Sequence, residues 1–222
     1  DKYPGLKAEG KLARAAVSVG KPVLGVCLGH QIIATALGAK LKSGDAPEIG
    51  FAPIKRVDKH DFFSMWDKQL TVLHWHNDVV GLPAEGQLLS RSSSTKVQAF
   101  RLGSALGMQF HLEVCGSLLD EWLDEPSMVK DLKAAGGSKS QLREQFAQYD
   151  QLLQPLAEQV FSGFAARCIA ADYLYPAGGA PAEALLRGEC CRAVAKAGKR
   201  DSGQVETGIV REAISVTGMG AG

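Results

Sequence analysis

The sequence lacks the features that mark membrane, secreted and nucleic-acid-binding proteins. It contains no run of about 18 apolar residues, the length that a membrane-spanning helix needs. Residues 1–10 are polar and predict no signal peptide. The formal net charge is only +1, so charge gives no reason to expect a polyanionic partner. The basic stretch at residues 187–211 has no interleaved aromatic side chains, so binding to nucleic acid is not expected.

Cysteine is also scarce. Five cysteines without a repeating spacing do not form a disulfide framework, so we expect a reducing, cytoplasmic environment. Cys115 and Cys168 are predicted to be buried packing residues. Cys190 and Cys191 are adjacent and are expected to be incidental, which leaves Cys27 as the cysteine with a distinctive setting.

Aromatic residues are absent from residues 176–222, where glycine and alanine dominate. Such a stretch buries too little apolar surface to offset the entropy that is lost on ordering. We therefore predict one domain over residues 1–175, followed by a weakly ordered tail over residues 176–222.

Within the predicted domain, helical and strand patterns alternate, which is typical of an α/β fold. Helices are predicted over residues 6–19, 31–37, 118–123, 127–134 and 140–173, and Pro155 is expected to kink or interrupt the last of them. Strands are predicted over residues 22–26, 52–57, 70–75, 87–91, 97–102 and 105–110, with a hairpin turn between the last two.

The sharpest local motif is GVCLGHQ at residues 25–31. A cysteine with a glycine two residues before it and another two residues after it, between a strand and a helix, is typical of a nucleophile elbow. The N-terminal end of the following helix would favour the thiolate of Cys27, and the amide of Leu28 would donate to an oxyanion. Taken alone, the pattern also fits a buried structural cysteine.

A base and an acid that orients it are found in QFHLE at residues 109–113. On an extended segment, His111 and Glu113 face the same side, so the carboxylate can fix the imidazole tautomer and stabilise the imidazolium. Phe110 and Leu112 then point into a core. The alternative is a strand end with unrelated polar residues.

His74 and His76 form an H-x-H pair on one face of a predicted strand, and such a pair is able to bind a metal. No third ligand with suitable spacing is evident. We therefore predict no metal site, and we expect no cofactor.

Together the two motifs, 84 residues apart from Cys27 to His111, resemble the signature of the class I glutamine amidotransferases. The segment EIGF at residues 48–51 resembles the loop that follows the nucleophile helix in this family. The segment HWHND at residues 74–78 and the strand approach GKPVLG at residues 20–25 resemble the GMP-synthase-like branch.

The resemblance implies a flavodoxin-like sheet wrapped by helices and a glutamine amidohydrolase activity. In this family a cysteine in the position of Cys27 attacks the side-chain amide of glutamine, ammonia leaves, and water clears a glutamyl thioester. The resemblance assigns the base to His111 and the orienting acid to Glu113. It further implies a synthetase partner that receives the ammonia.

The resemblance also suggests the residues that bind the substrate. It places Gln31 against the bound glutamine. Trp75, Asn77 and Asp78 border the backbone groups of the glutamine, and Leu28 supplies an oxyanion donor.

The family begins with strands that would precede Asp1, one of which ends in a Gly-Gly turn that supplies a second oxyanion donor. We therefore expect an N-terminally truncated domain that lacks its first strands and is poorly stable by itself. Two other functions stay open. One is a stand-alone hydrolase of γ-glutamyl bonds, and the other is a non-catalytic, truncated amidotransferase-like domain.

Overall fold

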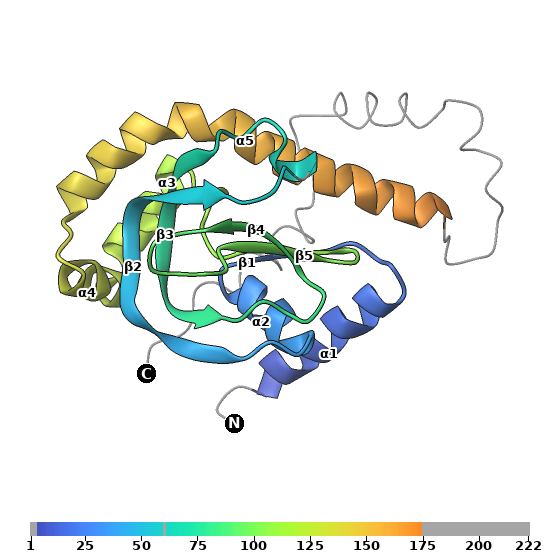
Figure 1. Cartoon of the computed structure of the whole chain (residues 1–222). Coiled ribbons are helices and arrows are strands. Elements are labelled where there is room, and N and C mark those ends of the chain that lie inside the picture. The colour runs from blue at the N-terminus through green and yellow to red at the C-terminus, as the bar shows by residue number, and fades with distance from the viewer. Residues whose placement is uncertain (1–3, 60, 175–222) are drawn as a thin grey trace.

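The computed structural model describes residues 4–59 and 61–174, and it shows a mixed sheet flanked by helices (Figure 1). The predicted tail, residues 176–222, lies outside the described residues. The helices are α1 (Pro4–Ser18), α2 (Leu28–Ala36), α3 (Gly116–Asp124), α4 (Pro126–Ala134) and α5 (Lys139–Leu174), with a short 3-10 helix at Asp61–Phe63. The strands are β1 (Val23–Val26), β2 (Leu41–Arg56), β3 (Gln69–Val80), β4 (Gln87–Arg91), β5 (Ala99–Leu102) and β6 (Ala105–Met108).

The six strands form one sheet in the order β1-β6-β5-β4-β2-β3. The β1–β6 pair is parallel, and the other pairs are antiparallel. Within the described residues, β1 pairs only with β6 and therefore forms one edge of the sheet. The α/β class predicted from the sequence is confirmed.

Helices cover both faces of this sheet (Figure 1). On one face, Ile33 and Ala34 of α2 are buried against Val80, Phe100 and Ala105 of the sheet, and α1 packs beside them. On the other face, α5 buries its apolar side chains against β2, β3, β4 and β6. The two apolar faces explain why the short strands are poor in polar side chains.

A third apolar cluster holds α3 and α4 against the sheet. Leu119 and Leu123 of α3 pack with Leu132 of α4 and Leu142 of α5 around Leu73 of β3. This cluster lies under the segment that links β6 to α3, and it thereby fixes the path of residues 109–115.

Of the two effects predicted for Pro155, a kink or an interruption of the last helix, the interruption is wrong. Pro155 lies inside an unbroken α5, which arches over the sheet (Figure 1). Pro155 is exposed, so the backbone group that loses its intrahelical partner is on the solvent side of a curved helix, where water can replace the partner.

No helix among the described residues is both long and apolar enough to cross a membrane.

Candidate active site

Cys27 lies at the sharp turn between β1 and α2, where its backbone has φ 51° and ψ −105°. Such angles are rare for a residue with a side chain and mark a strained position. Cys27 is also the N-cap residue of α2, so its side chain starts at the positive end of the helix dipole. The predicted strand–turn–helix arrangement is confirmed.

The tight turn depends on Gly25. A Cβ atom at this position would overlap the backbone carbonyl group of Gly29 and would lie 2.6 Å from Cδ1 of Ile33. Real structures do not contain such contacts, so any larger residue would force the turn open.

We expect Gly25→Ala to lower the free energy of unfolding by roughly 1–3 kcal/mol or more, because backbone atoms cannot move aside as a side chain can. Urea denaturation of the two proteins measures the loss. Gly29→Ala is the matched control, since a Cβ atom there meets nothing within 4 Å. Equal unfolding midpoints for Gly25→Ala and the unmodified chain would contradict this account of the turn.

The imidazole of His111 and the carboxylate of Glu113 form a close pair. Nδ1 of His111 lies 2.6 Å from Oε1 of Glu113, and Oε2 of Glu113 accepts the backbone N–H of Leu112 at 3.0 Å. Phe110 and Leu112 are buried, as predicted. The carboxylate is therefore held from two sides and can fix the tautomer of the ring.

The backbone under this pair differs from the prediction. The strand predicted over residues 105–110 ends at Met108, and His111 is attached to β3 by one isolated bridge. In that bridge the N–H of His111 donates to the carbonyl of Leu73 at 2.8 Å. The pair thus lies on an irregular segment beyond the sheet, and not on an extended strand end.

The electrostatics of the pair favour the imidazolium. Burial opposes the charged form of His111, but the interactions with Glu113 and Cys27 outweigh it and raise the pKa of His111 to about 10. Burial likewise opposes the carboxylate of Glu113, yet the charge of His111 and its hydrogen bond lower the pKa of Glu113. The group that could take a proton from Cys27 is therefore stabilised in its protonated form.

The sheet brings Cys27 and His111 together. Cys27 follows β1 and His111 follows β6, which is the parallel neighbour of β1, so both residues leave the same end of the sheet. The N–H of Cys27 donates to the carbonyl of Met108 at 2.8 Å, which extends the ladder by one bond. Nε2 of His111 is buried, and Cys27 lies close enough to His111 to help raise the pKa of the imidazole.

Trp122 of α3 also belongs to this site. Its ring lies edge-on to His111, with ring centroids 5.0 Å apart, and edge-on to Trp75 at 5.4 Å. An aromatic wall of this kind excludes water from the imidazole. No sequence pattern singled out Trp122, because only the docking of α3 brings it to the site.

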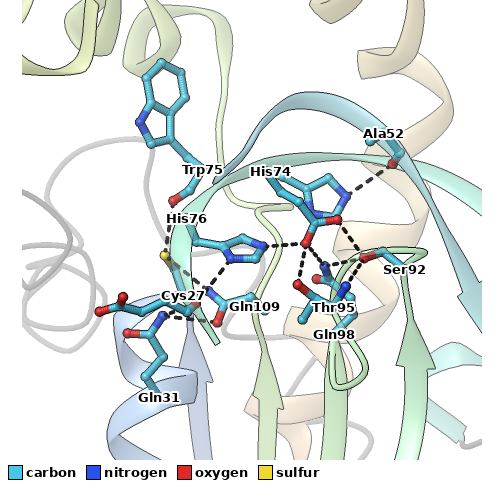
Figure 2. Close-up of polar contacts among 12 residues, drawn as sticks. Cys27, Gln31, Ala52, His74, Trp75, His76, Ser92, Thr95, Gln98 and Gln109 are labelled. Carbon is cyan, nitrogen blue, oxygen red and sulfur yellow. Dashed lines mark hydrogen bonds and ion pairs between the residues drawn. The ribbon is translucent and has the colours of Figure 1, made fainter. Parts of the chain in front are cut away.

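Gln109 is a second residue that the sequence did not single out as functional. Its Nε2 lies 3.6 Å from Sγ of Cys27, and its Oε1 accepts a hydrogen bond from Nε2 of Gln31 at 3.1 Å (Figure 2). Gln31, which the resemblance assigned to substrate binding, also donates to the carbonyl of Asp78 at 3.1 Å. The Nε2 group of Gln31 is therefore engaged within the protein.

Three of the other predicted substrate residues, Trp75, Asn77 and Asp78, lie on β3. Sγ of Cys27 is 3.7 Å from the carbonyl oxygen of Trp75. Asn77 is exposed and donates to the hydroxyl of Ser43 at 2.9 Å, and the side chain of Asp78 is exposed. Leu28 opens α2 directly after Cys27. The structure thus places Trp75 and Leu28 next to the thiol, whereas Asn77 and Asp78 lie further along β3.

The H-x-H pair has a third neighbour that the sequence analysis missed. Glu48 of β2 lies opposite His76 in the β2–β3 ladder, and ligand atoms of Glu48, His74 and His76 lie within 4.8 Å of one another. The strand pairing supplies this neighbour from 26 residues before His74, so local spacing could not reveal it.

Glu48 is already surrounded by hydrogen-bond donors. Its carboxylate accepts the hydroxyl of Ser92 at 2.6 Å, the hydroxyl of Thr95 at 2.5 Å and Nε2 of Gln98 at 3.0 Å, and it lies 3.3 Å from Nε2 of His76. Donors aimed at both oxygens leave little room for a metal ion. The cluster is best described as a half-buried carboxylate held by hydrogen bonds, beside two buried histidines.

The charge of Glu48 is expected to stabilise the fold in a pH-dependent way. Burial opposes ionisation, but the contacts with His76, Ser92 and Thr95 outweigh it and lower the pKa of Glu48 from 4.5 to about 2. A depressed folded-state pKa adds stability above the unfolded value, and this stability is lost as pH falls through the folded value.

Glu48→Gln should therefore lower the free energy of unfolding at pH 7 and flatten its fall between pH 4.5 and about 2. Denaturant unfolding at a series of pH values measures both effects. The exposed Glu158 provides the control variant Glu158→Gln. Parallel curves for Glu48→Gln and the unmodified protein would show that Glu48 ionises normally in the folded state.

One prediction about the other cysteines is wrong. Cys115 is exposed and not buried, because it caps the N-terminus of α3, with its sulfur 3.2 Å from the hydroxyl of Ser117. That hydrogen bond lowers the pKa of Cys115. Cys168 is half-buried on α5.

A cavity of about 170 Å³ lies beside Cys115, between residues 111–115 and α5, and it is lined mostly by apolar side chains. His111 and Glu113 border it, whereas Cys27 does not. The cavity therefore lies on the Glu113 side of the pair, away from the thiol.

The fold and the site define a glutamine amidotransferase of class I. The family model described as glutamine amidotransferase class-I matches residues 2–125, and the chain belongs to this family. The described fold is accordingly the flavodoxin-like α/β fold of these proteins.

Particular relatives agree with this assignment. The chain is 36% identical over 111 residues to the putative glutamine amidotransferase-like protein YfeJ of Salmonella typhimurium, covering 48% of this chain and 46% of that protein. It is 40% identical over 96 residues to a subunit of the glutamine-hydrolysing GMP synthase of Saccharolobus solfataricus, covering 42% of this chain and 51% of that subunit. The chain thus spans about half the length of the curated relatives it matches.

A solved structure is also similar. The crystal structure of a glutamine amidotransferase from Thermotoga maritima superposes with a TM-score of 0.69 at 30% identity, covering 73% of this chain and 70% of that one.

Proposed function

We propose that the protein hydrolyses the side-chain amide of glutamine and releases ammonia, with Cys27 as nucleophile, His111 as base and Glu113 as orienting acid. One observation carries the proposal. A cysteine in a strained turn at a helix N-terminus shares one end of the sheet with a buried His–Glu pair at 2.6 Å. Family membership and the glutamine-hydrolysing GMP synthase subunits among the relatives support it.

The chemistry follows from these groups. The thiolate of Cys27 attacks the amide carbon of glutamine, and the carbonyl electrons move to the oxygen, where the N–H of Leu28 can donate to the oxyanion. The imidazolium of His111 gives its proton to the nitrogen, the C–N bond breaks, and ammonia leaves. His111 then takes a proton from water as the water attacks the thioester, and glutamate is released.

The substrate contacts are part of the same proposal. Asn77 and Asp78 lie on β3 directly after His76, close in sequence to Trp75, whose carbonyl oxygen contacts the thiol, and their exposed side chains are accessible to the charged backbone groups of glutamine. Trp75 borders the same space. The amide nitrogen of Gln31 donates to the carbonyl of Asp78 and to the side chain of Gln109, so its hydrogen bonds are made within the protein.

The ammonia acceptor is proposed to be a separate synthetase, by analogy with the GMP synthase subunits among the relatives. The competing activity is hydrolysis of γ-glutamyl bonds in a peptide or conjugate, which the same triad could attack. A domain that binds without catalysis is the third possibility.

The direct test is to incubate the purified chain with glutamine and to measure glutamate and ammonia. Equal amounts of both products support the proposal. Release of an amine from γ-glutamyl peptides, without hydrolysis of glutamine, would favour the peptide hydrolase. Binding of glutamine without either product would favour the non-catalytic domain.

A further inference from the structure

Two buried amide side chains connect the thiol to the backbone of β3 (Figure 2). Nε2 of Gln109 lies 3.6 Å from Sγ of Cys27, and Oε1 of Gln109 accepts Nε2 of Gln31 at 3.1 Å. The same Nε2 group donates to the carbonyl of Asp78 at 3.1 Å. Gln109 is fully buried and Gln31 is 9% exposed, so water cannot readily replace these partners.

The partners decide which way each amide points. A side-chain amide has one end that accepts and one that donates, and a backbone carbonyl can only accept. The NH₂ group of Gln31 must therefore face Asp78, and its second hydrogen faces Gln109. The oxygen of Gln109 then points toward Gln31, which leaves the NH₂ group of Gln109 facing the sulfur of Cys27.

The far end of this chain of hydrogen bonds is anchored in the β2–β3 hairpin. Nδ1 of His76 lies 3.3 Å from the carbonyl oxygen of Asp78, and Nε2 of the same ring lies 3.3 Å from Glu48. His76 therefore lies between the carboxylate of Glu48 and the carbonyl oxygen of Asp78. The acceptor that orients Gln31 is thereby fixed in place.

We propose that Gln109 stabilises the thiolate of Cys27 by donating its Nε2 hydrogen, and that Gln31 is a positioning residue that sets the direction of this amide. The inference rests on the proposed role of Cys27 as nucleophile and adds to it. A hydrogen bond to a charged group is stronger than one between neutral groups, so one directed donor is enough to change the reactivity of the sulfur.

The sharpest variant is Gln31→Glu, which nearly preserves the shape of the side chain. An amide nitrogen offers two hydrogens, whereas a carboxyl group offers at most one and cannot serve both acceptors. Gln109 must then turn its NH₂ group toward the new carboxyl. Its oxygen would face the sulfur and repel the thiolate.

The readout is the rate of alkylation of Cys27 by iodoacetamide at pH 7, without glutamine, followed by mass spectrometry of the Cys27 peptide. We expect Gln31→Glu and Gln109→Glu to slow this rate about tenfold, and Gln31→Met, which introduces no charge, to slow it about threefold. Exposed Cys115 in the same molecule is the internal reference and should react at an unchanged rate.

The direction of the change in the Cys27 alkylation rate distinguishes a positioning role of Gln31 from damage to the fold. An unfolded chain would expose Cys27 and raise this rate. Unchanged Cys27 rates in folded Gln31→Glu and Gln31→Met would overturn the inference. Hydrolysis of glutamine by Cys27→Ala, in contrast, would refute the proposed function and leave the alkylation result interpretable by itself.

Discussion

Replacing Cys27 by alanine is expected to abolish the release of glutamate from glutamine, with a fall in kcat of at least about a thousandfold. The variant has no sulfur to attack the amide carbon, so no thioester can form. His111 and Glu113 stay in place but have no nucleophile to activate. Coupled detection of glutamate, with ammonia measured in parallel, gives the rate.

Cys115→Ala is the matched control for the loss of Cys27. Cys115 is exposed and its side chain contacts the hydroxyl of Ser117 at the start of α3, so its loss should leave both kcat and KM unchanged. Thermal unfolding of the two variants checks that Cys27→Ala still folds. Normal turnover by Cys27→Ala would contradict the proposed mechanism. Inactivity of both variants would instead indicate a general loss of structure.

Glu113→Gln is expected to lower kcat by more than about tenfold, with a smaller change in KM. The substitution keeps the shape of the side chain but removes the charge that helps to raise the pKa of His111 to about 10. The pKa of His111 should therefore fall. The imidazolium that protonates the leaving ammonia would then be lost at a lower pH than in the unmodified protein.

The pH dependence of kcat tests whether the pKa of His111 falls in Glu113→Gln. The alkaline limb should move to lower pH in Glu113→Gln, since a group with a raised pKa keeps its proton until pH passes through that value. The exposed Glu158 supplies the control Glu158→Gln, which should keep the original profile. If Glu113→Gln left both kcat and the alkaline limb of its pH dependence unchanged, Glu113 would have no part in the proposed mechanism.

The parts of the site that the sequence could predict are local in the chain. The turn at Cys27 is encoded by Gly25 and Gly29, two residues to either side, between a strand and a helix. β1 appears where the pattern predicts it, and α2 begins at Leu28, three residues before the predicted helix. The β5–β6 hairpin turns at Gly103, whose φ of 58° suits glycine. In each case, short-range sterics decide the backbone.

The parts that could not be predicted depend on pairing between distant segments. β2 is 16 residues long and begins at Leu41, far before the predicted strand at residues 52–57, because Gly44 and Pro47 make its first half resemble a loop. An irregularity between Ser43 and Glu48 accommodates those residues and sets Glu48 opposite His76. Only the register of the two strands reveals that contact.

Tertiary context also explains the wrong prediction for Cys115. This residue lies between apolar residues of the chain, but α3 starts directly after it and turns it to solvent. Gln109 presents the reverse case, since a polar residue in the motif is fully buried. Neither outcome follows from hydrophobic pattern alone, because burial at a helix cap or beyond a strand end depends on what packs over it.

The parallel pairing of β1 with β6 has a kinetic consequence. It joins segments about 80 residues apart, whereas β4, β5 and β6 are joined by short connections and can pair early. Closing a long loop before its contacts form is slow. The thiol and the imidazole should thus meet in a late step of folding. A partly folded chain would contain the paired strands β4, β5 and β6 but no assembled site. Stopped-flow refolding in which iodoacetamide reports Cys27, beside tryptophan fluorescence, would reveal this order.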